Sequence, residues 1–303
     1  MSTTQESTES VKAPTAPPAP NRLKDLGRQL LGTRRVIVGL VLLALLALFA
    51  LVGPLVSGWE VGERDFTDIL GAPSADHWMG TNTTGQDIFT QTTAGLRKSL
   101  MIGLLVAVIT TAVAALVGSF AGYFGGLVDK GLMWIADLAL VLPSFVILAI
   151  LSTHFSGDGG WFVLVILLAV FSWMVTSKMV RGLTISLRER EYIHAARFMG
   201  VPPYKIILRH ILPNMSSLLI ADATIMVSSA IIGETALSYF GLGVQAPDVS
   251  LGVVIAAGSR FATTAWWMFA FPALLLVVMV LAVNMIGDGL RDALDPSSKS
   301  RRS

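Results

Sequence analysis

Residues 36–53 read VIVGLVLLALLALFALVG, and the 24 residues between Arg35 and Glu60 carry no charge. A helix of about 20 apolar residues is long enough to cross the hydrocarbon core of a bilayer. The stretch therefore predicts a membrane-spanning helix at 36–56. Because it is long and begins far from the N-terminus, we expect a retained anchor and not a cleaved signal peptide.

Five more apolar stretches follow along the chain. They predict spans at 99–123, 132–153, 161–181, 216–239 and 267–287. The composition agrees, since 53% of the residues are hydrophobic and 14% are charged, with a mean hydropathy of +0.69, whereas soluble domains are about one quarter charged. We expect an all-α membrane protein with six transmembrane helices.

The basic residues predict the orientation. With six spans and the N-terminus inside, 18 of the 22 Lys and Arg residues lie in cytoplasmic segments and 4 lie outside. Cytoplasmic loops of membrane proteins carry this excess of Lys and Arg. Both termini are therefore expected in the cytoplasm.

The predicted spans divide the chain into four parts. They are a disordered cytoplasmic tail rich in Ser, Thr and Pro at 1–22, an anchor helix with an external loop at 23–98, the main membrane domain at 99–290, and a cytoplasmic C-terminal tail at 291–303. Within the external loop, an amphipathic helix is expected around 85–97, leading into the second span.

Several kinds of chemistry are excluded by the residues present. The chain has no cysteine, so no thiolate site or disulfide forms, and its four histidines lack the spacing of metal ligands. No GxxxxGK[ST] loop is present to bind ATP, and no nucleophile lies beside a base. We expect no enzyme activity, no metal and no cofactor on this chain. The basic residues follow membrane topology, so a nucleic-acid partner is not expected.

A cytoplasmic loop carries the most specific pattern, REREYIHAARFMGVPPYKIILRHILPN at 188–214. It predicts a helix over 188–199, ended by Gly200 in the left-handed conformation. A second short helix is expected from Pro203 to Ile211, with proline in its first turn.

The first of these helices has one face suited to contact with another protein. Its three- and four-residue spacings bring together Tyr192, Ala195, Ala196 and Met199. Two small residues between larger ones allow a partner to approach closely, which favours a docking helix. The alternative is a solvated basic loop without a partner.

The same loop resembles the EAA motif of ATP-binding-cassette importer permeases, EAA-x3-G-x9-I-x-LP. The matching residues are Ala195, Ala196, Gly200, Leu212 and Pro213, whereas His194 replaces the family's Glu and His210 its Ile. The resemblance implies a coupling helix seated in a groove of a separate ATPase subunit, with Tyr192, His194 and Met199 also at that contact. His194 removes an acidic group that could pair with the ATPase.

Three other segments resemble dipeptide, oligopeptide and nickel permeases. They are HWMGTNTTGQD at 77–87 with GLRKSL at 95–100, TALSYFGLGVQAP at 235–247, and NMIGDGLRDALDP at 284–296. Asn82 and Gln86 depart from the family's Asp and Arg. Residues from about 22 to 296 share the resemblance, which implies a DppC/OppC-type subunit with the MetI-like fold of type I importer permeases.

The resemblance also implies partners and a location. The expected partners are a second permease of the DppB/OppB type, two ABC ATPase subunits or one homodimer that bind the ATP, an external substrate-binding protein, and membrane lipid. The expected location is the bacterial cytoplasmic membrane. Short peptides are the expected substrate, with nickel or glutathione as alternatives in the same family. A stand-alone ion-coupled secondary transporter and a non-transporting scaffold are alternatives of other classes.

Among the residues of the predicted spans, two carboxylates and one proline are candidates for a role in transport. Ionisable residues at membrane depth usually face the bundle interior or a water-filled path, so Asp137 and Glu234 are candidates to line the translocation path. A structural role, bonded to a neighbouring helix, is the alternative for both. Pro143 is expected to kink the third span, either as part of gating or as a fixed bend.

Overall fold

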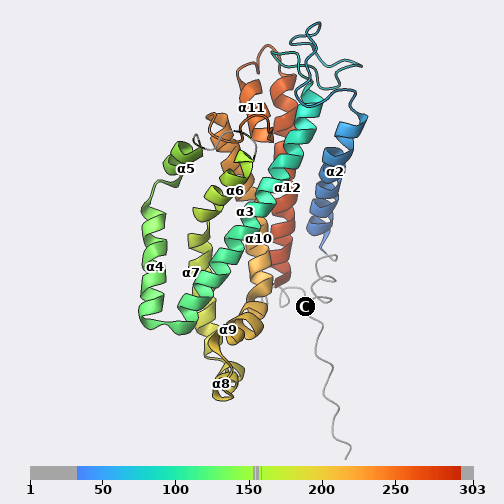
Figure 1. Cartoon of the computed structure of the whole chain (residues 1–303). Helices are drawn as coiled ribbons and strands as arrows, with labels where there is room; N and C mark the ends of the chain where they lie inside the picture. Colours follow the sequence, from blue (N-terminus) through green and yellow to red (C-terminus); the bar gives the residue numbers. More distant parts are fainter. Residues whose placement is uncertain (1–32, 153, 155–156, 158, 295–303) are drawn as a thin grey trace, which may run out of the picture.

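A computed structural model gives the arrangement of the chain and describes residues 33–152, 154, 157 and 159–294. The predicted tail at 1–22 and most of the tail at 291–303 lie outside these residues. Figure 1 shows an elongated bundle of helices. Its elements are α2 (Arg34–Val56), α3 (Ile88–Phe124), α4 (Gly126–Val141), α5 (Ser144–Ser152), α6 (Gly160–Val170), α7 (Trp173–Arg188), α8 (Glu191–Phe198), α9 (Pro203–Ile206), the π-helical turn η1 (Ile207–Ile211), α10 (Leu212–Tyr239), α11 (Leu251–Ser259) and α12 (Trp267–Leu294).

Four of the six expected spans are continuous helices, and two are broken. The continuous ones are α2, α3, the run Pro203–Tyr239, and α12. The expected span at 132–153 is wrong as a single helix, because α4 and α5 meet at an angle of 76°. The expected span at 161–181 is divided into α6 and α7, which meet at 44°. If each bent pair crosses once, the described residues hold six spans.

The central helix α3 is longer than the sequence predicted. The expected amphipathic helix at 85–97 is not separate, since α3 runs without interruption for 37 residues from Ile88, about 55 Å at 1.5 Å per residue. Asp87 begins it, because its Oδ1 accepts a hydrogen bond of 2.7 Å from the backbone N–H of Thr90, which satisfies one of the free donors of the first turn.

Close packing of α3 on α7 depends on two glycines. A Cβ added at Gly118 would lie 2.3 Å from the carbonyl oxygen of Ser177, and one at Gly122 would lie 2.7 Å from that of Arg181. The backbones can approach only where no side chain intervenes, as in other helix pairs with small residues four apart. Gly126, the next member of that spacing, has no atom within 4 Å of such a Cβ and takes no part.

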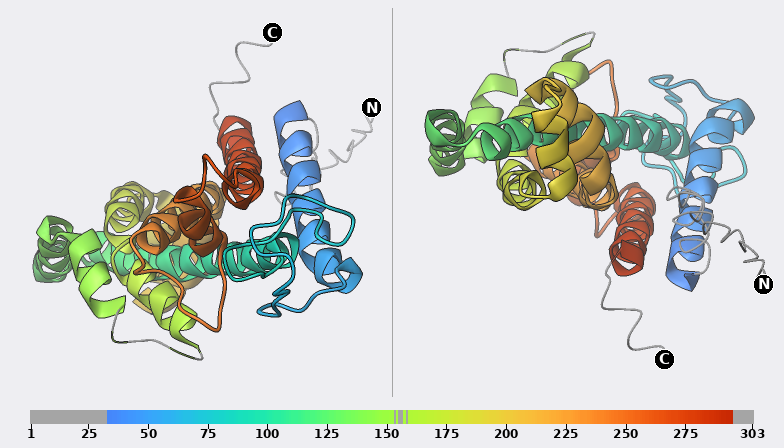
Figure 2. Two further views of the ribbon diagram at one scale, coloured as in Figure 1. Left: turned by 90° about the horizontal axis from the view of Figure 1, so that it is seen from above. Right: turned by 90° about the horizontal axis from the view of Figure 1, so that it is seen from below.

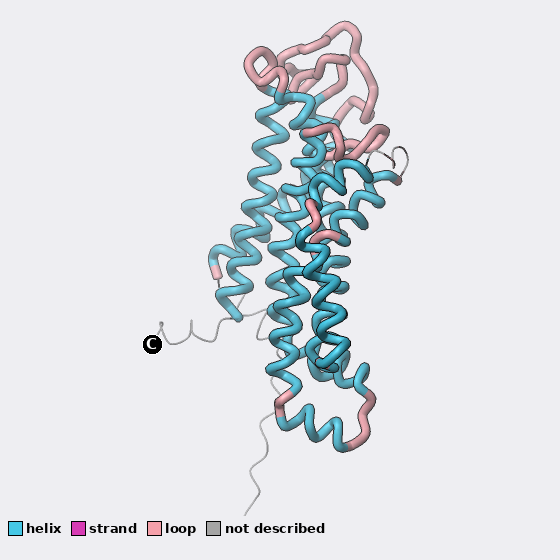
Figure 3. The backbone as a smooth tube through the Cα atoms, turned by 90° about the vertical axis from the view of Figure 1, so that its left-hand side faces the viewer, coloured by secondary structure: helices cyan, strands magenta, loops and turns pink. Residues whose placement is uncertain are grey.

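Loops gather at the end of the bundle that the sequence places outside the membrane (Figure 3). Within the loop 57–87, His77 is almost wholly buried. Its Nδ1 lies 2.9 Å from Oδ2 of Asp87, and its ring stacks on Trp59 at 4.5 Å between centroids. The hydroxyl and backbone N–H of Thr67 hold the pKa of the nearby Asp65 below its ordinary value. This loop is therefore an ordered cap over the start of α3.

A short helix that the sequence did not predict, α11, lies at the same end. Ser250 caps it by accepting a hydrogen bond from Val253 N–H and donates a bond of 2.6 Å to Oε1 of Glu234 on α10. Ser99 on α3 accepts a bond of 3.1 Å from Leu251 N–H. The start of α11 is thus fixed to both α10 and α3.

Seen along its axis, the bundle has two sides. Figure 2 shows α2 beside α12 on one side, with α4 and α5 on the other. Between them, α3, α6, α7 and α10 contribute to two clusters of buried apolar side chains, and a third cluster joins α2, α11 and α12 to α3 and α10. The helix α4 contributes little to this core, since Ala136 is its one buried residue.

Candidate functional site

The loop with the most specific sequence pattern forms the far tip of the bundle (Figure 1). Its helix α8 is shorter than expected, beginning at Glu191 and ending at Phe198. Gly200 has φ of +75°, the left-handed conformation predicted for it, which favours glycine. The N–H of the next residue, Val201, donates a bond of 3.1 Å to the carbonyl of Ala196. The chain is thereby turned back toward α9.

One side of α8 is an anchor and not a docking surface. Ile193 has no exposed area and Ala196 is 3% exposed, because both pack in a cluster with Ile206, Ile207 and Ile211. The expectation that Ala196 shares an accessible face with Tyr192 and Met199 is therefore wrong. Because Ile193 and Ala196 are three positions apart, they lie on the same side of α8, and this side faces the bundle.

The opposite side of α8 is open. Tyr192, Ala195 and Met199 are exposed as predicted, with Met199 at 75%. Phe198 was missed by the sequence reasoning, although at 90% it has the most exposed apolar side chain in the described residues. Its exposure could have been predicted from the spacing of Ile193 and Ala196, because residues on the side of a helix opposite the buried ones face outward. Phe198 and Met199 thus give this side of α8 an exposed apolar surface.

Two basic residues contact the end of α3, Arg188 from the last turn of α7 and Arg197 from α8. Arg188 donates a hydrogen bond of 2.9 Å to the carbonyl of Gly122, and the guanidinium of Arg197 lies 5.2 Å from the ring centre of Tyr123. His194, which stands where the resembling family has Glu, lies 3.7 Å from Glu189 through Nε2. The side chains around the tip are thus held in place by their own neighbours.

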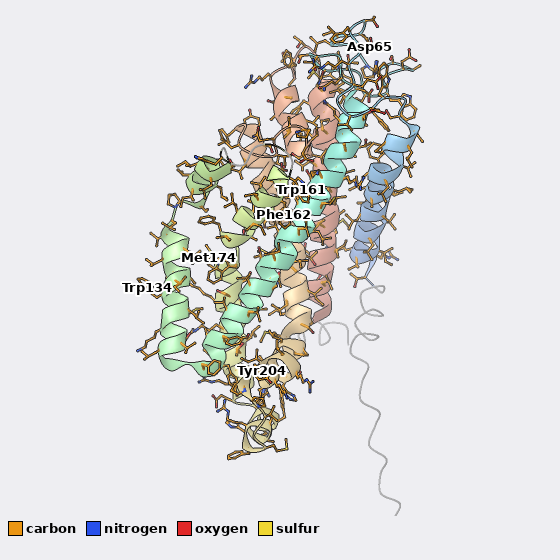
Figure 4. All side chains as sticks on the ribbon, viewed as in Figure 1. Asp65, Trp134, Trp161, Phe162, Met174 and Tyr204 are labelled. Atoms are coloured by element: carbon orange, nitrogen blue, oxygen red, sulfur yellow. The ribbon has the colours of Figure 1, made fainter. Side chains whose placement is uncertain are left out.

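The second short helix expected at 203–211 is not separate either. From Pro203 the chain continues through η1 into α10, so that one run of 37 residues ends at Tyr239. Pro213 has no N–H to donate and would crowd the preceding turn of an α-helix. The wider π turn immediately before it accommodates this. Leu212 packs beside the cluster that anchors α8, and Figure 4 places Tyr204 at the same junction. The anchor of α8 is therefore part of a membrane-spanning helix.

The two carboxylates singled out within the spans lie in different surroundings. Asp137 on α4 is exposed and pairs with Lys178 on α7. About two turns before Asp137 on α4, Asp129 pairs with Arg181 of α7. A hollow of about 480 Å³ lies between the two helices beside these ion pairs. Glu234 has no exposed area, and its Oε1 accepts bonds of 2.6 Å from Ser238 and Ser250, a burial that favours the structural alternative.

Pro143 lies at the break between α4 and α5. The residue before it, Leu142, has an extended backbone with ψ of 136°, as expected for a residue that precedes proline. The helix cannot continue through this conformation, so α5 starts in a new direction. The bend is much sharper than the kink expected from the sequence.

Among the described residues, no three His, Asp or Glu side chains are grouped to hold a metal ion. The tip formed by α8 carries exposed apolar side chains on one side and packs with its other side in one cluster with Ile206, Ile207 and Ile211.

Comparison with known proteins gives three findings. Residues 114–300 match the family described as "Binding-protein-dependent transport system inner membrane component". The oligopeptide transport system permease protein OppC of Mycobacterium tuberculosis (strain ATCC 25618 / H37Rv) is 49% identical over 275 residues, covering 91% of this chain and 94% of the relative. The dipeptide transport system permease protein DppC of Bacillus subtilis (strain 168) is 34% identical over 289 residues, covering 95% and 88%.

A solved structure agrees on the fold. One chain of the MetNI methionine ABC transporter in an inward-facing conformation superposes with a TM-score of 0.51 at 19% identity, covering 66% of this chain and 95% of that one. At this identity the likeness concerns the fold alone.

Proposed function

The chain belongs to the family of binding-protein-dependent transport system inner membrane components, and we propose that it is the DppC/OppC-type permease subunit of an ATP-binding-cassette importer for short peptides. Relatives named as oligopeptide and dipeptide permeases align with nearly the whole chain, which supports peptides over nickel or glutathione. The permease itself catalyses no reaction, and ATP is bound and hydrolysed by partner subunits.

The proposed complex has four kinds of component. This chain and a second, DppB/OppB-type permease enclose the path, two ABC ATPases bind at the cytoplasmic face, and an external binding protein delivers the peptide. Six spans cross the bacterial cytoplasmic membrane if each bent pair counts as one. The excess of Lys and Arg at the α8 end favours cytoplasmic termini.

The observation that carries the proposal is the exposed tip of α8 and its rigid connection to α10. Phe198 and Met199 are free to enter an apolar groove of the ATPase, with Tyr192, His194 and Ala195 beside them. Gly200 sets the turn, and Ala196 and Leu212 belong to the anchor, whereas Pro213 lies exposed in the first turn of α10. Because Ile193 packs directly on residues of η1, movement of the ATPase would move the 37-residue helix as well.

Asp137 supports a water-filled or protein-covered surface between α4 and α7. It lies in α4, five residues into the span expected at 132–153, about 8 Å along the helix axis, and therefore within the cytoplasmic half of a bilayer core of about 30 Å. An exposed charged pair at that depth is costly against lipid. The surface that carries Asp137 and Lys178 should therefore face the second permease or the path, with Pro143 at its outer edge.

An exposed aromatic on the tip provides the test. We would replace Phe198 by Asp in the full complex and measure co-purification of the ATPase and ATP-dependent peptide uptake in membrane vesicles. Central apolar contacts of an interface are worth at least about 2 kcal/mol, so ATPase affinity should fall about 30-fold. The matched control is Phe66→Asp, since Phe66 is also a largely exposed phenylalanine but lies in the external loop.

Both measurements can contradict the proposal. Normal ATPase recovery and uptake with Phe198→Asp would remove α8 from the contact. Recovery of the unaltered chain without any ATPase or second permease, under conditions that preserve other membrane complexes, would favour a transporter that acts alone.

A further inference from the structure

An uncharged cavity of about 220 Å³ lies between α3, α5, α6 and α10. Small residues of α10 form one wall, and the first residues of α5 form another. The lining that matters below is Ser144, Phe145, Ser172, Ser229, Gly233 and Ala236. The cavity is smaller than the about 300–1,000 Å³ of pockets that enclose a whole small ligand. A whole drug-sized ligand therefore does not fit, whereas a short segment of a longer molecule does.

The polar groups of the cavity are hydroxyls, and two of them are free. Ser172 donates a bond of 2.7 Å to the carbonyl of Leu168 in its own helix. Among the residues that the structure describes, neither Ser144 nor Ser229 makes a side-chain hydrogen bond. On α10, Ser229 is exposed to the cavity, whereas the adjacent Ser228 is only 3% exposed and packed away from it.

Two aromatic rings meet at the outer end of the cavity. Phe145, which lines the cavity at the start of α5, contacts Phe240 just past the end of α10 edge-on, with 5.6 Å between ring centres. Phe240 itself borders a second, external hollow of about 640 Å³, which Arg260 also lines. The ring pair thus lies between an inner uncharged space and an outer open one. The break at Pro143 is what directs α5, and with it Phe145, toward this position.

We infer that this cavity is the part of the translocation path that receives the backbone of a peptide, with Phe145 and Phe240 as its external gate. The inference rests on the proposed function. Peptide N–H and C=O groups lose free energy when they leave water without a partner, and free serine hydroxyls can both donate and accept. A lining without charge neither traps nor excludes particular side chains, so peptides of different sequence can enter and leave.

Because the chain has no cysteine, a single introduced cysteine is the one thiol labelled on this chain, and labelling is measured on this chain after it is separated from its partners. We would compare Ser229→Cys with Ser228→Cys in the complete transporter in vesicles, using a small membrane-impermeant cationic thiol reagent with and without saturating peptide. Ser229→Cys should react readily, and peptide at about ten times its dissociation constant should slow the reaction about tenfold. Ser228→Cys should react slowly under both conditions.

The gate is tested by the same reaction. Phe145→Ala and Phe240→Ala, each combined with Ser229→Cys, should speed labelling from the external side without ATP. Trp78→Ala combined with Ser229→Cys is the control, since Trp78 is an exposed aromatic of the external loop that contacts neither gate residue. Faster labelling with the control alone would count against the gate.

Two results would overturn the inference. One is equal reactivity of the two cysteines, and the other is reaction of Ser229→Cys that peptide leaves unchanged while uptake continues. In that second case the chain still transports peptides, so only the location of the path fails. If the unaltered complex takes up no peptide, the proposed function itself fails.

Discussion

Replacing Ile193 by alanine should release α8 from the bundle without altering its exposed surface. Ile193 is fully buried and packs with Ile206, Ile207 and Ile211. In the proposed arrangement α8 lies in water beyond the membrane, so its attachment depends on ordinary hydrophobic burial. The alanine variant keeps helix propensity high and removes only the anchoring side chain.

The size of the effect follows from the burial. Truncation of a buried isoleucine to alanine costs about 2–5 kcal/mol, depending on how far the site can collapse. Each 1.4 kcal/mol changes an equilibrium about tenfold. The detached state of α8 should therefore become at least about 30 times more populated.

Amide hydrogen exchange measures this directly, because it reports the free energy of local opening. The N–H groups of residues 195–201, several of which bond to carbonyls within the α8 turn, should exchange at least about 30 times faster in Ile193→Ala, while exchange in α3 stays unchanged. The matched control is Tyr192→Ala, which removes a large exposed side chain from the adjacent position. Unchanged exchange in Ile193→Ala, or an equal increase in Tyr192→Ala, would refute the anchoring role.

Three further substitutions test other parts of the structure. Gly118→Val should separate α3 from α7, because its Cβ would meet the carbonyl of Ser177; overpacking of this kind costs about 1–3 kcal/mol, seen as a lower Tm in detergent. His77→Ala should also lower the Tm, since it leaves Asp87 buried with one partner fewer, at a cost of about 1–3 kcal/mol; an unchanged Tm would mean that the cap does not stabilise α3. Pro143→Ala should restore a backbone donor and straighten the break between α4 and α5, so that peptide uptake falls more than the Tm does; equal uptake would show that the bend is not needed for transport.

The sequence predicted those elements that local chemistry determines. Long uncharged stretches led to α2 and α12, and the left-handed turn was expected at Gly200 because glycine followed by two prolines ends a helix. In each case the signal and the structure are set by the same few neighbouring residues.

Elements that depend on distant contacts were missed. No proline or glycine marks the break after Phe171, where the Ser172 hydroxyl donates a hydrogen bond to the carbonyl of Leu168, a bond that often bends helices. The helix α11 is too short to be predicted as a membrane span, although Ser250 is a residue type that commonly begins a helix. Ala196 is buried by residues of η1. The sequence reasoning treated that segment as a helix separate from the fifth span, so it could not predict this contact and assigned Ala196 to the accessible face.

The uninterrupted helix from Pro203 to Tyr239 links displacements on the two sides of the membrane. It is about 55 Å long, with the support of α8 at one end and Phe240 of the aromatic pair just past the other. If such a rod pivots near its middle, a tilt of about 10° moves each end by about 5 Å in opposite directions. A sideways pull on the cytoplasmic end would then move the external end in the opposite direction. The path would close on one side of the membrane as it opens on the other, without a chain of side-chain rearrangements between them.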